Sequence, residues 1–446
     1  MNYYKNNFHL EAPNGLINDP NGISYFQGTY YVFHQWNRFA CDHSYKEWGL
    51  FLSENLVDWS HSGSAILPDS PQDSHGVYSG SAIVFNNELR IFYTGNTKLN
   101  STRKSYQQSV VSKDGQTFLK TNSFETPEGL TEHHRDPKVF LYGNDWYMIV
   151  GSQTQDYIGA IALYSSSDLE NWKYQGICFK DSELDQMCEC PDLLDFGDKQ
   201  VLLVCPQKRN IEIDQDCSSY SGYYVGQFNG QKFLPSTKLF LLDHGFDFYA
   251  PQTFRDPEGR YLMWAWMSRM TDEEEQACPT LAFDYLHCLT MPREIILDKE
   301  GRLLQKPIKE ILDRRKQLKI DSSKQLDFIQ TGDSLVLDVY FESEASDFKL
   351  NLAEGIAIFS YKNKQLCLQR KSWIDGKMHK KHLLIEKLEY FQLFLDQSAI
   401  EMFINDGDKV ISLRYFPEKE LKKHQFTCDT SHQAFLYKLE IGEQNG

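Results

Sequence analysis

Three acidic residues stand in local contexts that could make them chemically active. Asp19 lies in Asn18-Asp19-Pro20-Asn21-Gly22, where the proline favours extended backbone at Asp19 and Asn-Gly then turns the chain. The other two are Asp136, in Arg135-Asp136-Pro137, and Glu189, in Glu189-Cys190-Pro191. One carboxylate can attack carbon or activate water, while a second, protonated carboxyl delivers a proton to a departing oxygen. Since the chain has 62 acidic residues, only context can single these out.

The sequence contains its own control for Asp136. Arg255-Asp256-Pro257 repeats the same tripeptide but continues into Glu258-Gly259, so a plain turn explains it. Asp136 leads instead into the apolar run Lys138-Val139-Phe140-Leu141, which places its carboxyl at the start of a strand. We therefore expect Asp136, and not Asp256, to belong to a site.

The elements that must position these acids are short strands. Up to about residue 305, short apolar runs alternate with turn-forming residues, which is typical of an all-β chain. Four related segments end in the aromatic residues Trp59, Phe118, Trp172 and Phe233, spaced by about 54 to 61 residues. That period is in the range of propeller blades, and five such units would occupy roughly 290 residues.

The remainder of the chain has a different pattern. Residues 305–319 form a charged amphipathic stretch that predicts a linking helix. Beyond residue 320, runs with period-two alternation predict a second all-β domain, most simply a β-sandwich. We therefore expect a domain over 1–304, a linker helix over 305–319 and a sandwich over 320–446. The acidic run Asp272-Glu273-Glu274-Glu275 is expected to be a solvated loop near the rim of the first domain.

Taken together, the three acidic motifs resemble those of glycoside hydrolase family 32, the invertase and β-fructosidase family. The resemblance implies that Asp19 is the nucleophile, Asp136 the transition-state stabiliser and Glu189 the acid/base. It also implies a five-bladed β-propeller followed by a β-sandwich, in agreement with the repeat. The matching positions implied to bind the sugar substrate are Asn18, Gln35, Trp48, Ser79, Arg135, Tyr249 and Trp266.

Within the family, Asp73-Ser74-His75-Gly76-Val77-Tyr78 and Thr131-Glu132-His133-His134-Arg135 look most similar to intracellular bacterial enzymes that act on sucrose 6-phosphate. The resemblance thus implies a retaining β-fructofuranosidase for that sugar, for sucrose, or for both. Arg38 stands where the family has proline after Gln35-Trp36-Asn37, and we expect it to contact the phosphate through a two-pronged, charge-assisted contact.

Other functions remain to be weighed. A fructan or fructo-oligosaccharide hydrolase, or a fructosyltransferase, would use the same acids, whereas a propeller that only binds sugar would not need all three. The resemblance implies no metal and no organic cofactor, and the spacing of His75, His133 and His134 does not support three metal ligands.

Composition limits the partners and the compartment. A formal net charge of −16 argues against a nucleic-acid partner, and no apolar run is long enough for a membrane span. The N-terminal residues 1–7 lack the apolar stretch of a secretion signal, and the ten cysteines form no CxxC pair. We therefore expect a cytoplasmic protein that acts on a small sugar, while the oligomeric state is left open.

Overall fold

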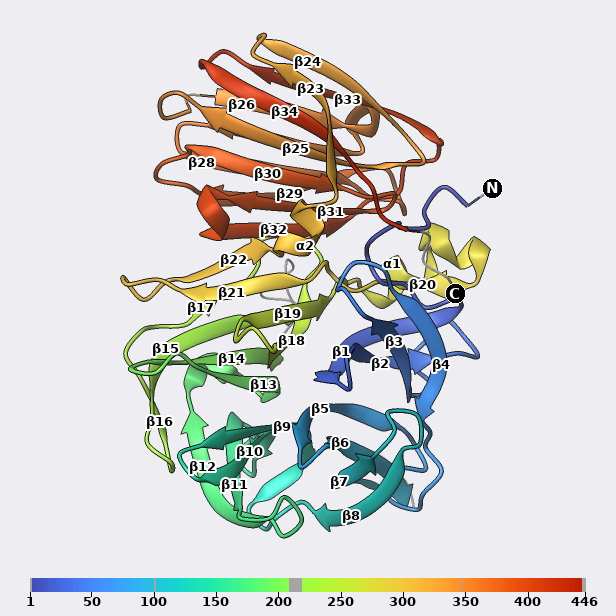
Figure 1. Cartoon of the computed structure of the whole chain (residues 1–446), viewed down its shortest axis with the longest axis vertical. Helices are drawn as coiled ribbons and strands as arrows, with labels where there is room; N and C mark the ends of the chain where they lie inside the picture. Colours follow the sequence, from blue (N-terminus) through green and yellow to red (C-terminus); the bar gives the residue numbers. More distant parts are fainter. Residues whose placement is uncertain (1, 100–101, 208–218, 346, 443–446) are drawn as a thin grey trace.

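The computed structural model describes residues 2–99, 102–207, 219–345 and 347–442. In these ranges the regular structure is almost entirely β-strand, and the α-helices are the short turns α1 (Asp272–Gln276) and α2 (Lys309–Leu312). The all-β prediction is confirmed. Figure 1 shows a layered body formed by the C-terminal strands above a set of smaller sheets. No helix in the described ranges is long and apolar enough to cross a membrane.

Five small sheets occupy residues 15–307. The first contains β20 (Tyr285–Leu286), β1 (Gly15–Phe26), β2 (Thr29–Asn37), β3 (Glu47–Ser53) and β4 (Ser60–Ile66). The second contains β5 (Val77–Phe85), β6 (Glu88–Leu99), β7 (Thr102–Ser112) and β8 (Leu119–Glu125), and the third β9 (Leu130–Tyr142), β10 (Asp145–Thr154), β11 (Gly159–Ser166) and β12 (Lys173–Lys180). The fourth contains β13 (Met187–Asp195), β14 (Gln200–Gln207), β15 (Gly222–Phe228), β16 (Phe233–Pro235) and β17 (Phe240–Leu241), and the fifth β18 (Tyr249–Arg255), β19 (Tyr261–Trp266), β21 (Arg293–Leu297) and β22 (Leu303–Pro307).

The first strands of the five sheets meet around a common centre. Strand β1 lies beside β5, β5 beside β9, β9 beside β13, β13 beside β18, and β18 beside β1, so the five form a closed ring. Strand β20, which follows β19 in the chain, pairs in parallel with β1 and ties the end of this region to its beginning. Residues far apart in the sequence therefore face one another across this centre.

The predicted repeat corresponds to a recurring turn between the third and fourth strands of a sheet. In three sheets a serine hydroxyl at the end of the third strand accepts a backbone N–H three residues later, each at 3.0 Å; these are Ser53, Ser112 and Ser166. Asn or Asp two residues after each serine accepts a further N–H in the same turn. Such side-chain-to-backbone bonds define Asx and ST turns, which explains why the repeat was visible in the sequence.

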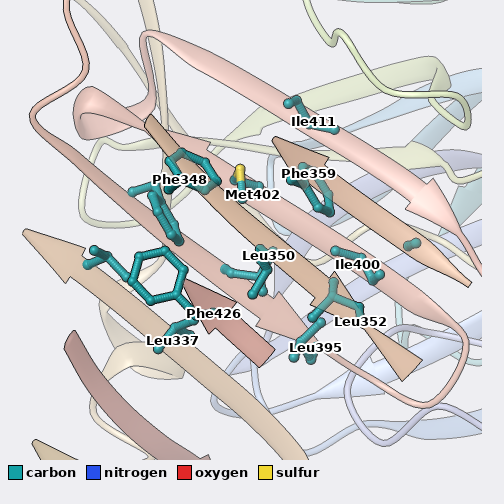
Figure 2. Packing of buried hydrophobic residues seen from close by; sticks show 14 of the residues in the cluster. Leu337, Phe348, Leu350, Leu352, Phe359, Leu395, Ile400, Met402, Ile411 and Phe426 are labelled. Carbon is teal, nitrogen blue, oxygen red and sulfur yellow. The ribbon is translucent and has the colours of Figure 1, made fainter. Parts of the chain in front are cut away.

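Two six-stranded sheets form the C-terminal sandwich. One contains, in order, β23 (Arg315–Asp321), β34 (His432–Leu439), β25 (Ser334–Phe341), β30 (Tyr390–Leu395), β31 (Ala399–Ile404) and β32 (Lys409–Arg414). The other contains β24 (Gln325–Thr331), β33 (Leu421–Cys428), β26 (Asp347–Leu352), β27 (Ala357–Lys362), β28 (Gln365–Lys371) and β29 (Met378–Leu384). Figure 2 shows side chains of both sheets, such as Leu337 and Phe426, packed into one core.

The linker helix predicted for 305–319 is wrong. Residues 303–307 form the last strand of the fifth sheet, with Leu303 and Gln305 buried in period-two alternation. Only α2 is helical, and from Arg315 the chain already pairs with β34. The charged residues gave this stretch the composition of an amphipathic helix, but its two ends hydrogen-bond into sheets.

A buried polar network and an apolar cluster join the sandwich to the first part of the chain. His9 is fully buried between two sandwich carboxylates, with Nδ1 2.9 Å from Asp396 and Nε2 3.0 Å from Glu401. Arg293 of β21 also binds Glu401, at 2.5 Å. The surrounding cluster contains residues of both parts, such as Leu10 and Phe394. The two parts therefore share one interior.

Candidate active site

The first strand of each small sheet breaks its pairing register at an equivalent place. The breaks lie between Ile17 and Pro20 in β1, Val77 and Gly80 in β5, Arg135 and Lys138 in β9, Glu189 and Asp192 in β13, and Tyr249 and Gln252 in β18. Proline stands at four of the five breaks, at positions 20, 137, 191 and 251. Because proline has no N–H to donate, a regular ladder cannot continue through it.

These bulges bring consecutive side chains to the same place. In a regular strand neighbouring side chains point to opposite faces, but both members of Asn18-Asp19, Tyr78-Ser79 and Arg135-Asp136 line one cavity. Asp136 takes φ = 67°, in the left-handed region that residues with a side chain seldom adopt. Strained backbone of this kind is often found at functional sites.

The cavity at the centre of the ring has a volume of about 300 Å³. Its lining comprises Asn18, Asp19, Gln35, His43, Lys46, Tyr78, Ser79, Arg135, Asp136, Glu189, Gln207, Ser219, Tyr249, Trp266, Arg269 and Met270. All three acids selected from the sequence are among them, as are six of the seven expected sugar-binding residues.

Asp19 is held by a chain of short hydrogen bonds. The Ser79 hydroxyl donates to its Oδ2 at 2.5 Å, and the Gln35 amide donates in turn to the Ser79 oxygen at 2.6 Å. Asn18 donates to Gln35 at 2.7 Å and more weakly to Asp19. Burial raises the pKa of Asp19, while the Ser79 bond and the Lys46 charge oppose that rise. The carboxylate is thus fixed in direction.

Lys46 is a member of this group that sequence reasoning missed. Its ammonium donates to Gln35 at 3.0 Å and to Asn18 at 3.3 Å, and burial lowers the pKa of Lys46 against the pull of Asp19. It lies at the start of β3, one residue before Glu47, where nothing in the local sequence marks it. Its contribution is positive charge beside the carboxylate.

Asp136 lines the same cavity. Its Oδ2 accepts from the backbone N–H of Cys190 at 3.0 Å, and its own N–H donates to Thr94. Burial raises the pKa of Asp136 to about 7; Arg135 opposes that rise, whereas the charges of Glu189 and Asp19 add to it. The Cys190 thiol lies 3.5 Å from Asp136 and 3.9 Å from Asp19, so it connects the two acids.

Hydrogen bonds to both carboxylate oxygens fix the orientation of Glu189. Arg135 donates from Nε and Nη2 to Oε1, at 3.0 and 2.6 Å, and the Tyr249 hydroxyl donates to Oε2 at 2.7 Å. Burial and the charge of Glu189 hold the pKa of Tyr249 well above its ordinary value, so Tyr249 stays a donor. The sequence placed Arg135 beside Asp136, but the carboxylate that its guanidinium binds is that of Glu189, and Nη1 lies 3.2 Å from His133.

Trp266, the last residue of β19, and Arg269 and Met270 after it line one side of the cavity, here called the mouth. The Trp266 ring packs edge-on against His43 and His287. Glu275 of α1 binds the imidazole of His287 at 2.8 Å and that of His43 at 3.4 Å. The predicted solvated acidic loop at 272–275 is therefore wrong in part, because these residues lie in α1 and Glu275 is a hydrogen-bond partner of two histidines at the site.

Two predicted contacts lie elsewhere. Trp48 is fully buried behind the cavity, where its ring packs against Phe33 and its indole donates to the Tyr78 carbonyl at 3.0 Å. Arg38 also lies outside the lining, because its guanidinium faces buried Glu47 and donates to Ser64 at 2.9 Å. Full burial contradicts the sugar contact expected at Trp48. Arg38 lies outside the cavity lining, so the geometry gives no support to the phosphate contact expected there.

One sequence signal for the site went unused. At each of the five breaks one residue directly precedes proline or glycine, and these residues recur about 54 to 60 positions apart: Asp19, Ser79, Asp136, Cys190 and Ala250. That spacing identifies Ser79 directly, and Tyr249 only as the neighbour of Ala250, without any resemblance. Among the described residues, no group of three or more His, Cys, Asp or Glu is arranged to hold a metal ion.

Sequence comparison gives this geometry a context. Residues 9–307 match the model described as Glycosyl hydrolases family 32 N-terminal domain, and residues 302–441 match Glycosyl hydrolases family 32 C terminal. Sucrose-6-phosphate hydrolase of Bacillus subtilis is 36% identical over 433 residues, covering 93% of this chain and 89% of the relative. The enzyme of the same name from Klebsiella pneumoniae is 35% identical, covering 92% and 88%.

Comparison with solved structures finds proteins of the same kind as the sequence comparison. Sucrose-6-phosphate hydrolase from Lactobacillus gasseri superposes with a TM-score of 0.89 at 29% identity, covering 99% of this chain and 94% of that one. The family 32 β-fructofuranosidase of Bombyx mori gives 0.82 at 25% identity, covering 98% and 94%, and a mutant of it has been solved in complex with sucrose.

Proposed function

Because the chain belongs to glycosyl hydrolase family 32, we propose that it is a retaining β-fructofuranosidase that releases fructose from sucrose 6-phosphate and from sucrose. The observation that carries the proposal is the lining of one cavity by Asp19, Glu189 and Asp136, each held by its own donors. Relatives named sucrose-6-phosphate hydrolase support the substrate class.

The reaction proceeds in two displacements. An Asp19 oxygen attacks the fructosyl C2 while protonated Glu189 gives its proton to the glycosidic oxygen, so that glucose or its 6-phosphate leaves. Glu189 then takes a proton from water, the water oxygen attacks C2, and the ester bond to Asp19 breaks. Fructose leaves with both carboxyls restored, and Asp136 accepts hydrogen bonds from fructose hydroxyls and stabilises the oxocarbenium-like transition state.

We infer that the five small sheets are blades of a five-bladed propeller with the fructose site on its axis. The closed ring of β1, β5, β9, β13 and β18 supports the number of blades. The equivalent breaks in these strands support a site built from the same position of successive blades. We place the domain boundary at about residue 308, between β22 and β23.

The phosphate of the substrate is proposed to meet the cavity mouth and not Arg38. Arg269 and Lys46 line the same cavity as the three acids, and the His43 imidazole lies 3.5 Å from the Lys46 ammonium. These two cationic side chains thus lie at the site on a chain of net charge −16. A charge-assisted contact contributes about 1.5–3 kcal/mol, which corresponds to roughly a ten- to hundredfold preference for the phosphorylated sugar.

A cytoplasmic location fits this substrate, because a fructosidase meets sucrose 6-phosphate where transport has phosphorylated the sugar. The nine cysteines in the described ranges are all free thiols, as expected in a reducing compartment.

One assay tests the proposal: fructose release from sucrose, sucrose 6-phosphate, kestose and inulin in parallel. Asp19→Ala should lose at least about 10³-fold in turnover while remaining folded, because the covalent route is gone. Asp256→Asn is the matched control, since Asp256 is bonded to Arg260 in a turn outside the cavity. Preferred cleavage of inulin would favour a fructan hydrolase, and binding without fructose release would refute an enzyme.

A further inference from the structure

A single arginine of the sandwich joins two segments that lie next to residues lining the active-site cavity. Arg370 of β28 is only 3% exposed, and its guanidinium donates from Nη1 to Asp247 at 2.6 Å and from Nη2 to Glu274 at 3.2 Å. The rings of Phe246 and Trp373 lie against it, with centroids 4.6 and 4.7 Å away. Planar geometry and two separate donor edges allow arginine to bridge two carboxylates, which lysine cannot do in the same way.

The first carboxylate lies at the beginning of the wall that orients Glu189. Asp247 is two residues before Tyr249, the residue whose hydroxyl binds Glu189 at 2.7 Å. Asp247 also accepts the backbone N–H of Arg414 at 2.8 Å, so sandwich residues bind it from two directions. Arg370 therefore holds the segment that carries Tyr249 to the acid/base.

The second carboxylate lies in α1, shortly after two residues that line the cavity, Arg269 and Met270. Glu274 closes a capping box with Thr271 at the start of α1, the five-residue helix that follows Arg269 and Met270. A helix of this length is unstable in water on its own, so it needs contacts from outside. Arg370 supplies one such contact and Trp373 another, because its indole donates to the Glu274 carbonyl at 2.9 Å.

These contacts continue to the substrate side of the cavity. The Trp373 ring packs in the same apolar cluster as Met270, which lines the mouth. Glu275, next in the helix, holds His43 at 3.4 Å, and His43 lies 3.5 Å from the Lys46 ammonium. Bonds from His287 and His43 outweigh burial and lower the pKa of Glu275 to about 2, so Glu275 stays ionised.

We propose that Arg370 and Trp373, carried by the β28–β29 hairpin of the sandwich, are positioning residues that fix α1 and thereby the leaving-group side of the active site. The sandwich is then part of the substrate-recognition apparatus of this chain and not only a stabilising appendage. The inference rests on the proposed function in one respect, namely that the leaving sugar occupies this mouth.

The test compares three variants with a matched control. Trp373→Phe keeps a ring but removes the bond to α1, so KM for sucrose 6-phosphate should rise about three- to tenfold while kcat stays within about twofold. Arg370→Ala should lower kcat/KM by about tenfold or more, through a lower kcat and a higher KM. Arg370→Lys should recover part of that loss. Arg315→Ala, which breaks another arginine–aspartate pair within the sandwich, should lower the melting temperature and leave KM unchanged.

A second readout is independent of activity. Amide hydrogen exchange over residues 268–278 should accelerate in Trp373→Phe and in Arg370→Ala but not in Arg315→Ala. Folded variants with wild-type KM and unchanged exchange in this segment would overturn the inference. A wild type that releases no fructose, with exchange in α1 still responding to Trp373→Phe, would instead refute the proposed function and leave the positioning role standing.

Discussion

Replacing Ser79 with alanine isolates the hydrogen bond that most directly controls Asp19. The hydroxyl donates to Asp19 Oδ2 at 2.5 Å inside the cavity, and it is the only side-chain donor within 3 Å of this carboxylate in the described ranges. A hydrogen bond to a charged group contributes about 1.5–3 kcal/mol, and one pKa unit corresponds to about 1.4 kcal/mol. The pKa of Asp19, already raised by burial, should therefore rise by about one to two units.

The consequence for activity has a definite sign. In the proposed mechanism Asp19 must be ionised to attack, so activity appears as pH rises through its pKa. A higher pKa therefore moves the acidic limb of the profile to higher pH. Since the Gln35 amide that now donates to Ser79 can turn towards Asp19, the lower figure of about one unit is expected. At a pH below the limb, kcat/KM should fall about tenfold or more, and well above it the loss should be small.

The assay measures kcat/KM for sucrose or sucrose 6-phosphate between about pH 4 and pH 9. The pH dependence of kcat/KM reports the pKa values of the essential groups in the free enzyme. Ser24→Ala serves as control, because Ser24 lies in the same strand as Asp19 but donates to the Gly22 carbonyl at 3.1 Å. An acidic limb that does not move in Ser79→Ala, or an equal loss at every pH, would refute the assignment of Ser79 and Asp19 to one functional unit.

Two further predictions concern Glu189 and His9. Glu189→Gln should slow sucrose hydrolysis by about 10²- to 10⁴-fold but cost much less on a fructoside whose leaving group needs no proton; equal losses would exclude Glu189 as the acid. Burial alone would lower the pKa of His9, but its bonds to Asp396 and Glu401 raise that pKa above the ordinary value. The stabilising contribution of His9 is therefore complete below about pH 6.5 and is lost as pH rises through the folded-state pKa. Melting temperatures should therefore decline on the alkaline side, and His9→Gln, compared by circular dichroism over the same range, should flatten that decline; an unchanged slope would contradict it.

Much of the molecule could be predicted from sequence because the deciding interactions are local. The turn repeat was visible since Ser and Asn or Asp bond to backbone within three residues, and Asp19 and Asp136 were visible because proline follows each of them. Lys46 and Glu275 were missed because their roles depend on partners far away in the chain, Asn18 in one case and His287 in the other. Trp48 was misplaced for the same reason: its burial depends on Phe33 and Tyr93, which no local pattern reveals.

The comparison of Asp136 with Asp256 shows what turns a common tripeptide into a site. Both aspartates follow arginine and precede proline, and both are buried, but Asp256 lies past the end of β18 and bonds to Arg260 four residues away. Asp136 instead occupies the bulge of a first strand, where φ = 67° rotates it so that it and Arg135 reach the same cavity. A strained bulge is costly unless neighbouring structure holds it, and here the N–H of Cys190, itself in a bulge of the next sheet, binds the Asp136 carboxylate. Each irregular strand thus supports the next around the ring, so the acids become a site through their position in the closed ring and not through their tripeptides.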